Sequence, residues 1–144
     1  MTRKYLPTLS ELIDRLSINQ LKEVFITNGK ELYSKEISDI MSDIDSILIQ
    51  ESPNTELNAE IIRDIIILAQ FNLHIWENES KARNGVDEGN NLLLTHSLNG
   101  VRNRAKNNLQ NTIIEDGRLD LKVDCLSTKY TNWEPSNWGL NKNE

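Results

Sequence analysis

The chain has 144 residues, of which 38% are hydrophobic and 26% charged, and its formal net charge is −6 at pH 7. This length and composition are typical of one folded domain and differ from those of an intrinsically disordered protein. The acidic balance argues against a general nucleic-acid-binding protein, which normally carries a basic face.

The first two predicted helices lie before the proline at position 53. Thr8 and Glu11 have the spacing of a capping box, so a helix should begin there. Asn28 and Gly29 should end it, because glycine tolerates the left-handed conformation that follows a helix. A second helix, about residues 30–50, has a charged face opposite a clear apolar stripe. The stripe consists of Tyr33, Ile37, Ile40, Ile44 and Ile47. The short connection predicts an antiparallel hairpin.

Two further helices are predicted after this proline. The third should run from a cap at Asn54 or Thr55 to about Arg83, and the fourth from a cap at Asp87 to about Glu115. The first half of the third helix is apolar on more than one face, so we expect it to be central. Four helices with short connections predict an all-α, four-helix bundle-like domain.

We place this helical domain at residues 1–115 and a C-terminal tail at residues 116–144. From Leu119 to Cys125 apolar and polar residues alternate, which predicts a short strand or an extended segment. Trp133 and Trp138 stand in a polar stretch and should anchor the tail to the bundle or to a second subunit. The protein is therefore expected to form a homo-oligomer.

The compartment is indicated by what the sequence lacks. Cys125 is the only cysteine, so one chain builds no disulfide framework. The longest apolar run, residues 65–69, is far shorter than the ~20 residues of a membrane span. Residues 1–7 are not followed by the apolar stretch of a secretory signal. We expect a cytoplasmic protein, and its richness in Asn, Ile and Lys suggests AT-rich coding of bacterial or phage origin.

Polar residues continue the apolar stripes of the third and fourth helices. If these helices are antiparallel, the polar groups should face a shared cleft. An arginine fork suits phosphate or carboxylate, an amide both donates and accepts, and an indole offers a stacking surface. We therefore predict a site for a small anionic ligand, nucleotide-like or sugar-nucleotide-like. The alternative is a polar network that only fixes helix register, in a non-catalytic scaffold or interaction protein. The predicted ligand-binding residues are Asn72, Trp76, Glu79, Arg83, Asn99, Arg102 and Asn103.

Two segments resemble the signature helices of an uncharacterised bacterial helical family. Residues 73–83 contain the pairs Leu-His, Trp-Glu and Ala-Arg, and residues 98–103 contain Leu-Asn and Arg-Asn, in that family's order. Residues 8–18 are also similar to forms of the group. Its members are often encoded near glycosyltransferases. The resemblance implies an all-α fold with important polar residues at these positions, and it supplies no reaction.

Carboxylates on the first two helices give an alternative site. Glu11 with Asp14, and Glu36 with Asp39, each lie three residues apart and so share a helix face. Four carboxylates from facing helices suit Mg²⁺. The arrangement is similar to that of MazG-like nucleoside triphosphate pyrophosphatases, in which metal-bound water attacks a phosphate. This chain departs from their Glu-Glu-x-x-Glu pattern. Ligand binding without a cofactor and magnesium-dependent hydrolysis both stay open as predictions.

Overall fold

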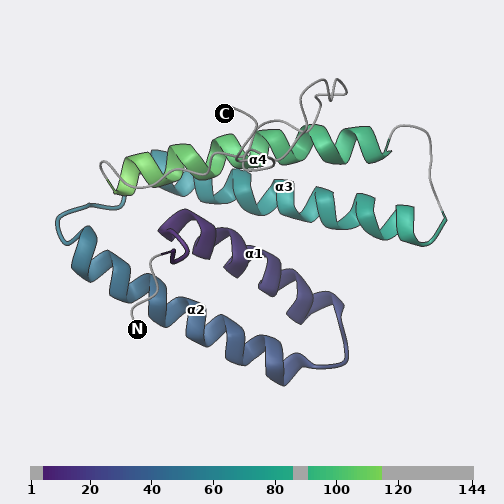
Figure 1. Ribbon diagram of the computed structural model, residues 1–144, viewed down its shortest axis with the longest axis horizontal. Coiled ribbons are helices and arrows are strands. Elements are labelled where there is room, and N and C mark those ends of the chain that lie inside the picture. The colour runs from purple at the N-terminus through teal and green to yellow at the C-terminus, as the bar shows by residue number, and fades with distance from the viewer. Residues whose placement is uncertain (1–4, 86–90, 115–144) are drawn as a thin grey trace, which may run out of the picture.

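The computed structural model describes residues 5–85 and 91–114, and within them the chain forms four helices and no strand (Figure 1). The expected all-α class is therefore confirmed for these residues. The element bounds are α1 (Leu9–Phe25), α2 (Lys30–Glu51), α3 (Ala59–Arg83) and α4 (Asn91–Ile113). In Figure 1, α1 lies in the middle, with α2 on one side and the pair of α3 and α4 on the other.

The ends of α1 and α2 follow local sequence signals, with one difference. Thr8 and Glu11 form the predicted capping box, in which the Thr8 N–H donates to Glu11 Oε2 at 2.9 Å. Helix α1 ends at Phe25, earlier than the glycine signal indicated. Gly29 does adopt the left-handed conformation, at φ 88°, but it does so as the residue that precedes α2. Gly29 is therefore the N-cap of α2 and does not directly follow α1.

Helix α3 begins later than predicted. Its cap is Asn58, whose side chain accepts a hydrogen bond from the Ile61 N–H at 2.9 Å. The predicted caps Asn54 and Thr55 were wrong, and Thr55 instead donates its hydroxyl to the Ile113 carbonyl at 3.1 Å. A hydroxyl engaged with α4 is not available to cap α3. Helix α3 ends at Arg83 as predicted.

The fourth predicted helix is present as α4, which is described from Asn91 onward. Its predicted cap, Asp87, lies outside the described residues. The predicted tail, with its alternating segment and Trp133 and Trp138, also lies outside them, so the strand and the domain boundary at residue 115 stay predictions. Within the described residues, no helix is long and apolar enough to cross a membrane.

The core lies toward one end of the helices. Leu9 of α1, Ile61 of α3, and Leu109 and Ile113 of α4 form a buried cluster. Partly buried residues of α2 pack against it from the side. These α2 residues are Ile44, Ile47 and Leu48. All four helices therefore meet at this end of the fold.

Away from that end the bundle is open between α2 and α3. Along most of its length α2 packs on α1, and it has no buried residue. The apolar first half of α3 is consequently less central than predicted, and Ile62, Ile65 and Ile66 are exposed. An apolar groove of about 590 Å³ remains, with Ile37 and Met41 on the α2 side. Because α2 packs mainly on α1, part of the apolar surface of α3 stays uncovered.

Candidate functional site

Helices α3 and α4 run antiparallel, as the predicted site requires. Near the start of α3, Asp64 accepts a hydrogen bond from Asn108, near the end of α4, at 2.7 Å. Farther along α3, Asn72 accepts one from Arg102, earlier in α4, at 3.2 Å. These two hydrogen bonds between α3 and α4 hold the polar parts of the two helices against each other.

A cleft of about 530 Å³ lies where α3 and α4 meet α1, and we call it the α1–α3–α4 cleft. The structure brings six of the seven predicted ligand-binding residues into its lining. They are Asn72, Trp76, Glu79, Arg83, Asn99 and Arg102. The seventh, Asn103, is buried at 7% exposure and is not part of that lining. Its Oδ1 has no hydrogen-bond partner among the described residues.

A buried polar network adjoins the cleft and reaches it through Asn72 and Arg102. Asn72 donates through Nδ2 to Asp14 Oδ1 at 2.8 Å while its Oδ1 accepts from Arg102 Nη1. On the other side of Asp14, Oδ2 lies 3.8 Å from Lys106 Nζ. Asp14 is 7% and Lys106 3% exposed, so most of the surface of this pair is removed from water. Buried charges of this kind need partners, and here the network supplies them.

This network joins the two constellations that the sequence presented separately. Asn72 belongs to the predicted ligand site, and Asp14 belongs to the alternative metal site. A side-chain amide both donates and accepts, so Asn72 can connect an anionic carboxylate to a cationic guanidinium. The carboxylate of Asp14 therefore serves to hold Asn72 and the cationic side chains beside the cleft.

The cleft is cationic although the whole chain is acidic. Lys22, Arg83 and Arg102 line it together with a single carboxylate, Glu79. Arg83 and Glu79 lie 3.9 Å apart with side chains 82% and 51% exposed, so their pairing is weak and screened. The Nε of Arg102 is buried and has no hydrogen-bond partner among the described residues. The lining of the cleft thus carries three cationic side chains and one carboxylate.

Trp76 supplies an aromatic wall. The indole lines the cleft, and its ring lies 6.3 Å from that of Phe25, with 26° between the ring planes. Offset stacking at this distance is favourable and limits the orientations of the indole. Phe25 comes from the last turn of α1, so the end of α1 positions the aromatic wall formed by α3.

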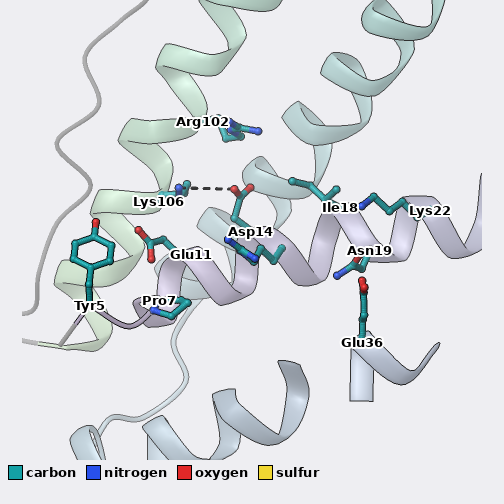
Figure 2. Close-up of a pocket in the computed structure, with 11 residues that line it drawn as sticks. Tyr5, Pro7, Glu11, Asp14, Ile18, Asn19, Lys22, Glu36, Arg102 and Lys106 are labelled. Atoms are coloured by element: carbon teal, nitrogen blue, oxygen red, sulfur yellow. Dashed lines mark ion pairs between the residues drawn. The ribbon is translucent and has the colours of Figure 1, made fainter. Parts of the chain in front are cut away.

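A second cavity, of about 690 Å³, lies on the other side of Arg102, and we call it the polar pocket (Figure 2). Three of the four predicted metal ligands, Glu11, Asp14 and Glu36, line it. Glu11 is engaged in the capping box and Asp14 in the buried network. In the described part of the chain, no three or more His, Cys, Asp or Glu side chains are grouped to hold a metal ion.

The fourth predicted metal ligand, Asp39, is not part of the polar pocket lining. It lies on the exposed face of α2, where it accepts a hydrogen bond from Lys35 Nζ at 2.7 Å. This hydrogen bond, together with the charge of Asp39, raises the pKa of Lys35. The three-residue spacing of Glu36 and Asp39 therefore does not bring both carboxylates to one site.

Sequence reasoning missed two cations of the site. Lys22 of α1 lines both cavities, and Lys106 contacts Asp14. A signal existed in the spacing, because Lys22 lies four residues after Ile18 and Lys106 four residues after Arg102. Residues four apart share a helix face. What the sequence did not contain was the position of α1 against α3 and α4.

The site therefore consists of two adjoining polar cavities around Arg102, one aromatic and cationic, the other of mixed charge. The resemblance of residues 73–83 and 98–103 to a bacterial helical family stays a prediction. No family model, curated protein or solved structure matches the chain.

Proposed function

We propose that the chain binds a small anionic ligand, nucleotide-like or sugar-nucleotide-like, in the α1–α3–α4 cleft. The observation that carries the proposal is the gathering of Lys22, Arg83 and Arg102 around one aromatic wall in a chain of net charge −6. A mainly structural polar network has no need of an open, cationic cavity beside it.

The chemistry of the lining defines the roles of its residues. Arg102 and Arg83 present planar forks that suit phosphate oxygens, and Lys22 adds a point charge. Trp76 offers a surface on which a planar heterocycle stacks. Asn99 at the cleft wall carries both a donor and an acceptor, which suits the polar edge of a base.

Isothermal titration of the full chain with nucleotides, sugar nucleotides and cyclic dinucleotides tests the proposal. Arg102→Ala is the direct variant, but Arg102 also bonds to Asn72. Arg83→Ala avoids that difficulty because the Arg83 side chain is 82% exposed. Loss of one charge-assisted hydrogen bond should weaken binding about tenfold.

The matched control is Arg63→Ala, since Arg63 is an exposed arginine on the same helix and is not part of the cleft lining. It should leave the affinity unchanged. Absence of binding across the panel, or equal weakening by Arg83→Ala and Arg63→Ala, would contradict the proposal.

The two alternatives predict other results in the same experiments. A magnesium-dependent pyrophosphatase would release pyrophosphate from a triphosphate and lose this activity in Glu36→Gln. A scaffold would bind none of the compounds. The positions of Glu11, Asp14 and Asp39, each engaged with another protein group, do not favour the metal reading over anion binding.

A further inference from the structure

The α1–α3–α4 cleft and the polar pocket adjoin each other. Their linings share Ile18, Lys22 and Arg102, and two of these three residues are cations. A ligand that enters the cleft and reaches Arg102 is therefore at the border of the second cavity. The shared cations are the natural place for the anionic group of a ligand that occupies both cavities.

The two cavities differ in the groups that they offer beyond this shared border. The cleft continues to Trp76, Ile75 and Ile26, a mainly apolar and aromatic wall. The polar pocket continues to the carboxylates Glu11 and Glu36 and to the cations Arg15 and Lys106. A planar heterocycle suits the first wall, whereas the mixed donors and acceptors of the second suit a group rich in hydroxyls.

Glu36 gives the polar pocket a hydrogen-bond acceptor from a third direction. Figure 2 shows its carboxylate reaching from α2 toward Asn19 of α1, across the pocket from the Asp14 and Lys106 pair. Asn19 is itself buried. A carboxylate accepts hydrogen bonds and an amide both donates and accepts, which is the pattern that hydroxyl groups require.

We infer that the ligand is a nucleoside diphosphate ester with three parts, one for each region. Its heterocycle lies against Trp76, its diphosphate lies between Lys22 and Arg102, and a hydroxyl-bearing group occupies the polar pocket beside Glu36 and Asn19. This inference rests on the proposed function of the cleft and adds the polar pocket as a second subsite that recognises hydroxyls.

Paired probes test the second subsite separately from the first. ADP and ADP-glucose, and likewise UDP and UDP-glucose, differ in the hydroxyl-bearing group and in the lower negative charge of the esterified diphosphate, so a gain in affinity for the sugar-bearing member cannot come from charge. Calorimetric titration of the full chain should give an affinity about tenfold higher for the sugar-bearing member of at least one pair, as expected for one good charge-assisted hydrogen bond. Glu36→Ala should remove this advantage.

Glu31→Ala is the matched control, because Glu31 is an exposed acid of the same helix and belongs to neither lining. It should preserve the advantage of the sugar-bearing probe. Equal affinities within both pairs, while Arg83→Ala still weakens them, would overturn the second subsite and leave the proposed function standing. Failure of all four probes to bind would overturn this inference, and failure of the wider panel would also remove the proposed function.

Discussion

One side-chain amide, that of Asn72, connects the ends of the buried network. It donates to Asp14 and accepts from Arg102, so replacing it leaves both charged groups short of a partner. We predict that Asn72→Leu, which keeps the size of the side chain, lowers the free energy of unfolding by about 2 kcal/mol. Urea denaturation measures this loss.

Asn111→Leu is the control for this prediction, because it is the same substitution at an exposed position of α4. Its effect should stay within about 0.5 kcal/mol. Equal stability of Asn72→Leu and the unaltered chain would mean that the network contributes nothing to the fold.

For single residues, the sequence predicted which helix face each site residue occupies better than it predicted the burial and the partners of that residue. The spacing on α3 and α4 placed Asn72, Trp76 and Arg102 on neighbouring faces, and they line one cleft. Asp14 was predicted as a metal ligand of the alternative site, and nothing in the sequence indicated that it is buried and bonded to Asn72. Helical spacing fixes the face on which a residue lies, whereas burial depends on the helix that covers that face.

At the scale of the helices, mutation of the two candidate caps of α3 distinguishes the observed start of this helix from the predicted one. Asn58 caps the helix by accepting from the Ile61 N–H, whereas Asn54 lies in the connection before it. We predict that Asn58→Ala lowers the free energy of unfolding by about 1 kcal/mol. Asn54→Ala should change it by less than about 0.5 kcal/mol. Thermal denaturation of both variants checks this, and a larger loss at Asn54 would contradict the observed start.

The helices themselves were predictable because their signals are local. The capping box at Thr8, the stripe of α2 and the end of α3 at Arg83 all depend on residues within a few turns. The partner of each apolar face was not predictable in the same way. Ile65 and Ile66 look central in the sequence but remain exposed, because α2 packs on α1 and leaves α3 partly uncovered.

For the whole molecule, the contrast between an acidic chain and a cationic cleft has a measurable consequence. Anion binding at Lys22, Arg83 and Arg102 should be partly electrostatic, since Arg83 is well exposed to solvent. Raising the salt concentration from 0.1 M to 1 M shortens the screening length from about 10 Å to about 3 Å. We predict a clear loss of affinity for the nucleoside diphosphates over this range, measured by calorimetry. An unchanged affinity would point to binding by stacking alone.

Self-association was also predicted at this scale. It was assigned to the tail, which lies outside the described residues, so it stays a prediction. The described helices do show exposed apolar side chains on α2 and α3, including Met41 and Ile66. Met41 lines the apolar groove, and neither side chain belongs to the linings of the two polar cavities.

The account depends above all on the α1–α3–α4 cleft being a ligand site. An NMR titration of the ¹⁵N-labelled full chain with ADP and UDP tests this most directly, because it locates binding residue by residue. We predict that the Trp76 indole N–H and the Arg102 Nε–H shift together with the backbone amides near Lys22 and Asn99. Shifts confined to residues outside the two cavities, or no shifts with either nucleotide, would contradict the account.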